Sequence, residues 1–240
     1  MATLFITGAG TEIGKTYIAC RLLRQLRRRG CRVLAFKPVA SGMVSLEDPA
    51  FAETDTARLL AAQGVPLNPE SVAACTPWSF ARALSPDMAA AAEGRSLQFA
   101  MINGWARVTL AQTPPATVVI IEGVGGVMSP IAADALNIDL IAALGCSAVL
   151  VSGTYLGAIN HALTAIEALR ARNVPVHALV LNETERSSVE FAATLRSLSR
   201  FAGGIRIIPV RFNEDAFAPS AFELAESILP KESGQRAEPI

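Results

Sequence analysis

The segment from 7 to 16 reads TGAGTEIGKT, a glycine-rich stretch that ends in a lysine and a threonine. Backbone N–H groups of such a loop can face a phosphate, while Lys15 can reach the outer phosphates and the Thr16 hydroxyl can ligate magnesium. Five residues separate Gly8 from Gly14, one more than the G-x-x-x-x-G-K-[ST] spacing has. The segment predicts a nucleotide site. The alternative is a strand-to-helix turn that binds nothing.

Two further charged residues stand where apolar runs end. Lys37 follows CRVLAF (31–36), and Glu122 closes TVVIIE (117–122). Ligands of open parallel sheets bind at the carboxyl ends of the strands, where a carboxylate can organise magnesium. A strand-end acid can also cap a turn, and an isolated strand-end lysine usually lies in solvent. Together with Lys15 and Thr16, however, Glu122 predicts a metal-bound nucleotide.

Alternating apolar strands and amphipathic helices must position these residues. The interval 37–116 shows no convincing buried strand, and the proline-containing stretch 64–77 predicts a loop. This order predicts an α/β fold of the P-loop NTPase type, with a doubly wound, mostly parallel sheet and helices on both faces. Apolar runs predict strands at 3–7, 31–36, 117–122, 147–152, 177–182 and 205–210. Helices are predicted at 15–29, 55–63, 86–93, 97–111 and 157–173.

The composition favours a globular protein. The chain has 240 residues, of which 51% are hydrophobic, and 21 basic residues balance 21 acidic ones, so net charge favours neither nucleic acid nor a membrane surface as a partner. Four scattered cysteines and two histidines argue against a zinc site or a disulfide framework. No apolar run approaches the ~20 residues that span a bilayer. We expect a cytoplasmic protein with one domain at 1–230 and a flexible tail at 231–240.

Six segments, taken in order, resemble one enzyme family. TGAGTEIGKT, FKPVASG, TDTARLL, IIEGVGG, LGAINHA and LVLNET together closely resemble the dethiobiotin synthetases, over about residues 3 to 210. The resemblance implies an ATP- and magnesium-dependent cyclo-ligase that forms C–N bonds in biotin biosynthesis. Its substrates would be 7,8-diaminononanoate and carbon dioxide. One amine becomes a carbamate, the γ-phosphoryl group of ATP moves to the carbamate oxygen, and the second amine closes the ring.

The resemblance also implies roles for single residues. Lys37, Lys15 and Thr11 would be catalytic. The two lysines would supply the fixed positive charge that carbamate and triphosphate need between them, because these anions repel each other. Substrate contacts are implied for Thr11, Ser41, Leu156 and Asn160, the last two near the interface of a homodimer. Metal binding is implied for Thr16, Asp55 and Glu122. Nucleotide contacts are implied for Glu12, Ile13, Gly14, Lys15, Thr16, Tyr17, Asp55, Glu122, Gly123, Val124, Gly125, Asn182, Pro209, Val210 and Arg211.

Some positions stay open. Glu12 either lies near the phosphates or is a loop acid that faces solvent, and Tyr155 has no assigned role. His161 is expected to pack or to hydrogen-bond rather than to catalyse. Ala9 and Gly10 stand where many family members have a threonine and an acid, so the loop is less polar here.

The alternative function is that of a P-loop switch ATPase of the partition or septum-placement type. Such switches carry an additional lysine early in the loop, where this chain has Gly10. A glutamine-hydrolysing synthetase of corrinoid pathways would need a long extra domain. A non-catalytic regulator would have no use for Lys15, Thr16, Lys37 and Glu122 together.

Overall fold

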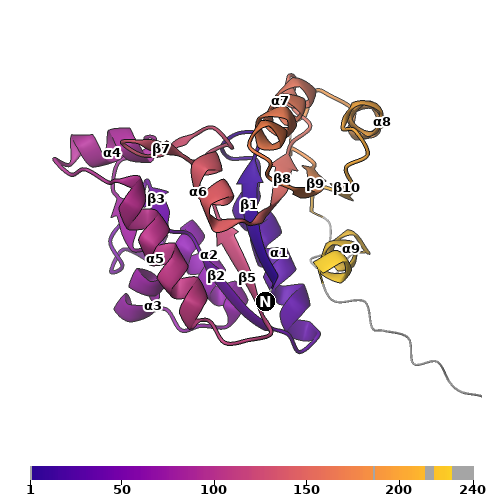
Figure 1. Ribbon diagram of the computed structural model, residues 1–240. Coiled ribbons are helices and arrows are strands. Elements are labelled where there is room, and N and C mark those ends of the chain that lie inside the picture. The colour runs from indigo at the N-terminus through magenta and orange to yellow at the C-terminus, as the bar shows by residue number, and fades with distance from the viewer. Residues whose placement is uncertain (1, 186, 214–218, 229–240) are drawn as a thin grey trace, which may run out of the picture.

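A six-stranded parallel sheet forms the centre of the computed structural model, which describes residues 2–185, 187–213 and 219–228 (Figure 1). The predicted domain end at 230 and the tail at 231–240 lie outside these residues. The first strand sits between the two halves of the sheet, so chain connections run outward from it in both directions, as predicted for a doubly wound fold. In spatial order the strands are β10 (Ile207–Val210), β9 (Val176–Asn182), β8 (Ser147–Ser152), β1 (Ala2–Gly8), β5 (Thr117–Glu122) and β2 (Arg32–Phe36).

Helices cover both faces of this sheet (Figure 1). The apolar sides of these helices pack on strands that are buried on both faces. A single hydrophobic cluster includes residues of the sheet and of the helices on both sides of it. One face carries α1 (Lys15–Arg28), α2 (Asp55–Gln63) and α9 (Pro219–Ile228). The other carries α5 (Phe99–Gln112), α6 (Asn137–Leu144), α7 (Ala158–Ala171) and α8 (Phe191–Phe201). Among the described helices, none combines the length and the apolar character needed to cross a membrane.

The predicted strands and helices are confirmed, with ends that differ by no more than two residues, and α4 (Pro86–Ala92) is among them. The sequence analysis did not predict α6, α8, α9, the short helix η1 (Pro49–Glu53) or the hairpin of β6 (Pro130–Ala132) and β7 (Ala135–Leu136). The hairpin, η1 and α6 are too short to show a clear apolar period, whereas α8 and α9 are amphipathic and could have been predicted from the spacing of their apolar residues.

Two predictions for the middle of the chain are wrong. The stretch 64–77 contains α3 (Pro69–Cys75), because Pro69 occupies a position at the helix start where proline is tolerated and Asn68 caps the helix. The interval 37–116 does contain strands. β3 (Val39–Ser41) and β4 (Trp78–Phe80) pair in parallel, but three residues each are too few to show a period.

A glutamine side chain completes the edge strand β2. The Gln63 amide nitrogen donates to the Ala35 carbonyl oxygen at 2.9 Å, and the Ala35 N–H donates to the Gln63 side-chain oxygen at 2.7 Å. Gln63 ends α2 and is buried. It therefore acts like one residue of a neighbouring strand, satisfying backbone groups that a sheet edge would leave open. The contact fixes β2 two residues before Lys37.

Replacing Gln63 should weaken the fold. Gln63→Ala leaves both backbone groups of Ala35 without their partner, so the free energy of unfolding should fall by about 2 kcal/mol. Gln112→Ala, at the exposed end of α5, serves as the control and should change it by less than about 0.5 kcal/mol. Urea unfolding followed by circular dichroism measures both. Equal midpoints for the two variants would contradict this role of Gln63.

Candidate active site

The loop between β1 and α1 is held in an unusual backbone conformation. Gly14 has φ 88° and Glu12 has φ 55°, both in the left-handed region that favours glycine. A Cβ on Gly8 would lie 2.9 Å from the Gly10 carbonyl oxygen, a backbone atom that cannot easily move away, so glycine is required where the loop folds back on itself. The Val127 N–H donates to the Gly8 carbonyl at 2.9 Å and ties the loop to the segment after β5. The loop thus leads directly into the N-terminus of α1, the place where a helix attracts an anion.

Lys15 points back across this loop. Its Nζ donates to the Gly10 carbonyl oxygen at 3.0 Å, and the residue is buried. Burial, together with the positive charge of Lys37, lowers the pKa of Lys15 to about 8. The ammonium is therefore held without a direct carboxylate partner, and a phosphate in the loop would stabilise its charged form.

Lys37 is the centre of a buried ionic cluster. Its Nζ donates to the Asp55 carboxylate and to Glu122 Oε1, the latter at 2.9 Å. Burial alone would lower the pKa of Lys37, but Glu122 and Asp55 more than offset it, so the pKa is raised. For Asp55, burial acts to raise the pKa and Lys37 acts to lower it, with a net lowering. Lys37 and Asp55 therefore stay ionised at neutral pH.

Three separate elements bring this cluster together. Glu122 ends β5, Asp55 begins α2 behind its capping residue Thr54, and Lys37 follows β2. The backbone N–H of Lys37 donates to the Cys75 carbonyl at 2.9 Å, at the end of α3. The helix α3, which was not predicted, thus helps to hold the backbone of Lys37 in place.

The oxygen atoms around Thr16 fit a magnesium ion. The Thr16 hydroxyl donates to Glu122 Oε1 at 2.7 Å. The other carboxylate oxygen of Glu122 is buried and has no hydrogen-bond partner among the described residues. A buried carboxylate oxygen without a partner is unfavourable unless a cation or water satisfies it. Two carboxylates and a hydroxyl are hard oxygen donors, few in number, as magnesium prefers.

A second turn borders the cluster. A Cβ on Gly123 would lie 2.8 Å from the Phe5 ring and 2.9 Å from the Asn137 side-chain oxygen, and Gly125 has φ 66°. Asn137, at the start of α6, donates to the Val124 carbonyl and to the Gly126 carbonyl. Asn137 was not predicted from the sequence as a residue of the site. An asparagine at the first position of an apolar helix could have indicated such a role.

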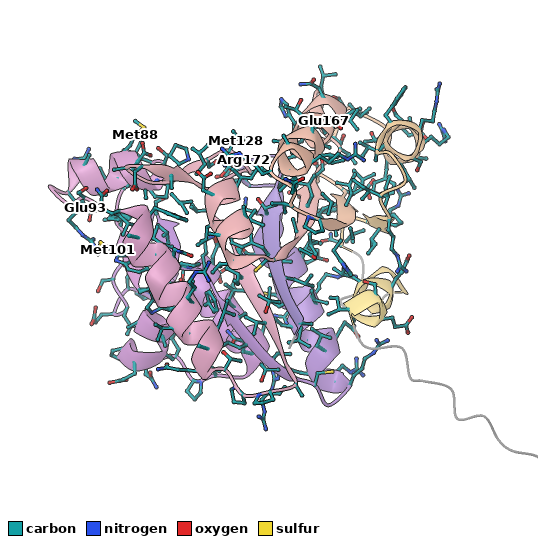
Figure 2. All side chains as sticks on the ribbon, in the orientation of Figure 1. Met88, Glu93, Met101, Met128, Glu167 and Arg172 are labelled. Carbon is teal, nitrogen blue, oxygen red and sulfur yellow. The ribbon has the colours of Figure 1, made fainter. Side chains whose placement is uncertain are left out.

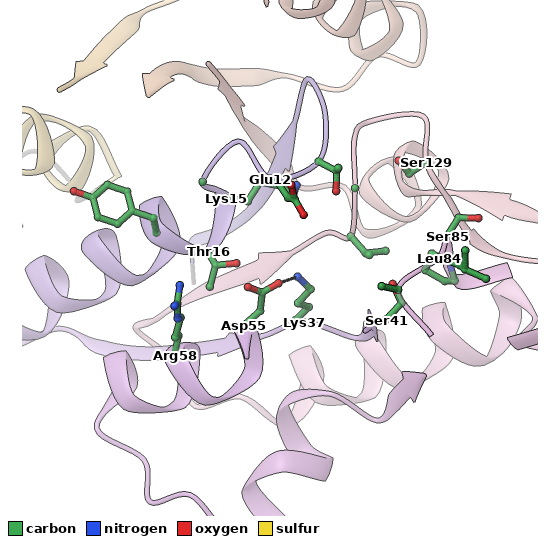
Figure 3. A pocket seen from close by; sticks show the side chains of 17 residues that line it. Glu12, Lys15, Thr16, Lys37, Ser41, Asp55, Arg58, Leu84, Ser85 and Ser129 are labelled. Carbon is green, nitrogen blue, oxygen red and sulfur yellow. Dashed lines mark hydrogen bonds and ion pairs between the residues drawn. The ribbon is translucent and has the colours of Figure 1, made fainter. Parts of the chain in front are cut away.

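The loop after β1, Lys37 and Asp55 line one cleft of about 700 Å³ (Figure 3). The predicted residues Ile13, Glu122 and Gly123 do not line it, and Glu122 is connected to it through its contacts with Thr16 and Lys37. Figure 3 shows Arg58 at one end, Ser41 and Ser85 at the other, and the Lys37–Asp55 pair between them. Of the predicted residues, Thr11, Glu12, Gly14, Lys15, Thr16, Tyr17, Lys37, Ser41, Asp55, Val124 and Gly125 line the cleft. Sequence analysis assigned no site role to Arg58, Leu84, Ser85 or Ser129, which also line it.

A second cavity of about 410 Å³ adjoins the first and includes the predicted residue Asn160. Thr11 and Ser129 line both cavities, so the two are continuous at these residues. His161 lies there too, and its Nδ1 shares a hydrogen bond of 2.9 Å with the Tyr155 hydroxyl, in line with the expected hydrogen-bonding role. Leu156 lines neither cavity and is 85% exposed.

The residues predicted to contact the base lie beyond the loop. Asn182 donates from Nδ2 to the Ile13 carbonyl at 3.1 Å and so supports the loop from outside. Pro209 and Val210 lie in β10 beside β9. The Arg211 guanidinium lies 3.3 Å from a Glu183 carboxylate oxygen and stacks 4.4 Å from the centre of the Phe191 ring. The structure therefore places Arg211 against Glu183 and Phe191 rather than in the main cleft.

Comparison with known proteins matches the chain to one family model and to a solved structure of the same fold. A family model described as an AAA domain matches residues 2–210. A ParA family ATPase from Chlorobium tepidum superposes with a TM-score of 0.51 at 14% identity, covering 94% of this chain and 91% of that one, which shows the shared fold.

Curated relatives are much more similar in sequence. The ATP-dependent dethiobiotin synthetase of Methylobacterium nodulans is 51% identical, covering 88% of this chain and 93% of its own. Those of Phenylobacterium zucineum and Acidiphilium cryptum are 39% and 42% identical, covering 92% and 85% of this chain and 93% and 89% of their own. With these identities over most of its length, and with both lysines and Asp55 lining one cleft beside the buried Glu122, the chain belongs to the family of ATP-dependent dethiobiotin synthetases.

Proposed function

We propose that this protein uses ATP to join 7,8-diaminononanoate and carbon dioxide into the cyclic urea dethiobiotin, a step of biotin biosynthesis. The observation that carries the proposal is the buried Lys37, held in the middle of the cleft between Asp55 and Glu122 and near Lys15. Family membership supplies the substrate class. Sequence similarity to named synthetases weighs against the switch-ATPase alternative, whose support is a fold-level likeness at 14% identity.

The reaction consists of one addition and two displacements. An amine nitrogen attacks carbon dioxide and loses a proton, giving a carbamate. A carbamate oxygen then attacks the γ-phosphorus of ATP, ADP leaves, and a carbamic-phosphoric mixed anhydride results. The second amine attacks its carbonyl carbon, phosphate leaves, and two C–N bonds now close the urea ring. The central difficulty is the second step, in which two anions must approach each other.

Fixed positive charge in the cleft would offset the repulsion between the carbamate and ATP. Lys15, pinned over the loop by the Gly10 carbonyl, can contact the β and γ oxygens, and Lys37 can bridge the carbamate and the γ-phosphoryl group. Because Lys37 is already ionised and held, little reorganisation is needed when negative charge develops. Thr16, Asp55 and Glu122 would hold the magnesium ion, which supplies further positive charge to the phosphate oxygens. Asn182 and the end of β10 would lie toward the base.

The diamine would occupy the serine end of the cleft. Hydroxyls of Ser41 and Thr11 both donate and accept hydrogen bonds, which suits an amine and its carbamate. Since Thr11 also lines the cavity that contains Asn160, the substrate tail would extend into that cavity, toward the N-terminus of α7.

A homodimer would complete this tail site. Met128 lines the same cavity, is 53% exposed and projects from the surface near α7 (Figure 2). Leu156, two residues before α7, does not line the cavity but is 85% exposed. A second copy of the chain would bury these apolar side chains. The cytoplasm as the place of the reaction remains a prediction from the sequence.

A direct assay tests the proposal. Purified protein is incubated with the diamine, bicarbonate, magnesium and ATP, and products are identified by mass spectrometry. We expect one dethiobiotin for each ADP and phosphate formed, and no turnover after magnesium is chelated. ATP hydrolysis that is indifferent to the diamine would support a switch ATPase instead.

Neutralising Lys37 should remove turnover while the nucleotide still binds. Lys37→Met keeps the length of the side chain but removes its charge, so turnover should fall about 100-fold or more, whereas the ADP dissociation constant should stay within a few-fold. Melting curves with ADP and magnesium check that the variant remains folded despite its unpaired carboxylates. Turnover within tenfold of the unmutated enzyme would exclude Lys37 from the reaction.

Nucleotide binding should take up a proton above neutral pH. Since the pKa of Lys15 in the free enzyme is about 8, a large fraction of Lys15 is neutral at pH 8.5, and a bound phosphate will raise that pKa. ADP binding at pH 8.5 should therefore show a calorimetric enthalpy that depends on the ionisation enthalpy of the buffer. Lys15→Arg, which stays protonated, is the control and should abolish the dependence. Equal enthalpies in two buffers with the unmutated protein would contradict the lowered pKa.

A further inference from the structure

Arg58 is a charged residue of the cleft that the mechanism above does not use. It lies three residues after Asp55 on α2, so both side chains project from the same side of that helix. Its backbone carbonyl accepts a hydrogen bond of 3.4 Å from Cys20 Sγ, which holds this turn of α2 against α1, one turn beyond Thr16. Arg58 therefore has a fixed base and a side chain that lines the cleft.

The guanidinium of Arg58 is held by an exposed ion pair with Glu53. It donates to a Glu53 carboxylate oxygen at 2.5 Å, and the two side chains are 52% and 76% exposed. An exposed ion pair of this kind is worth about 1 kcal/mol or less, so a better anion can take the place of Glu53. Lys15 and Lys37, by contrast, are buried and held by the protein.

The positions of the positive charges along the cleft indicate which part of the nucleotide lies near Arg58. Among the described residues that line the cleft, Arg58 is the one cation apart from Lys15 and Lys37. Figure 3 shows it at the end opposite Ser41 and Ser85, with the Lys37–Asp55 pair between. The γ-phosphoryl group must lie near Lys37 and toward the serine end. The rest of the nucleotide then extends from Lys37 toward Arg58.

We propose that Arg58 binds the α- and β-phosphates of the nucleotide, exchanging Glu53 for phosphate oxygens. The inference rests on the proposed function for the orientation of ATP. A guanidinium offers two parallel N–H groups that match two phosphate oxygens, a geometry that lysine cannot reproduce. ADP retains both phosphates, so this contact is made without the diamine and without chemistry.

The experiment is ADP binding with magnesium, measured by calorimetry without diamine. Arg58→Ala and Arg58→Gln should each raise the ADP dissociation constant about tenfold, and Arg58→Lys should raise it less. The matched control is Arg172→Ala. Arg172 has a side chain 51% exposed, is paired with Asp139 at 2.6 Å, and does not line the cleft. Its loss should leave the constant within twofold. Higher salt should weaken ADP binding less steeply in Arg58→Ala than in the unmutated protein.

Glu53→Gln separates a phosphate contact from a structural one. It frees the guanidinium, so ADP binding should be unchanged or tighter. If Glu53→Gln weakens ADP binding as much as Arg58→Ala does, the ion pair matters for structure and the proposal is wrong. The proposal is also wrong if Arg58→Ala and Arg58→Gln both bind ADP within twofold of the unmutated protein. It is wrong as well if the unmutated protein binds no ADP. Loss of the proposed function would appear differently, as absent dethiobiotin with ADP binding still dependent on Arg58.

Discussion

The ion pairs of Lys37 with Asp55 and Glu122 constrain the rest of this structure. An ammonium and a carboxylate removed from water are stable only when they face each other with good geometry, and removing one partner leaves a strongly unfavourable buried charge. The three residues come from the end of β2, the start of α2 and the end of β5. Each of these elements must therefore end or begin at the right residue for the cluster to exist. The same requirement places the lysine where two anions would otherwise repel each other.

The neighbouring loop meets a different constraint, which is steric. Gly8 and Gly123 leave no room for a Cβ, and Gly14 adopts a backbone angle that glycine tolerates best. These positions let the loop after β1 and the turn after β5 lie against each other above the sheet. The cleft thus combines a backbone cradle with a charged cluster at its side, with the exposed Arg58 at one end and the half-buried Ser41 and Ser85 at the other.

Much of this arrangement could be predicted from the sequence, for physical reasons. Buried strands and amphipathic helices have strong patterns, and parallel pairing brings their carboxyl ends to one edge, so Lys15, Thr16 and Glu122 were expected near each other. Asp55 could not be placed in the cluster without the family resemblance, since an acid at a helix start has a sufficient local reason to be there. Arg58, Ser85, Ser129 and Asn137 were missed because their roles depend on contacts between segments far apart in the chain. The helix α3 was not predicted because Pro66, Pro69 and Pro77 indicated a loop, whereas Pro69 is the first residue of the helix.

The measurement that tests the account most directly is a crystal structure with the diamine, magnesium and a non-hydrolysable ATP analogue bound. The account predicts that Lys37 Nζ lies within hydrogen-bonding distance of the terminal phosphate group, on the side that faces the diamine, with magnesium bound by Thr16, Asp55 and Glu122. A Lys37 side chain directed away from both ligands, with both fully bound, would contradict the central role given to this residue.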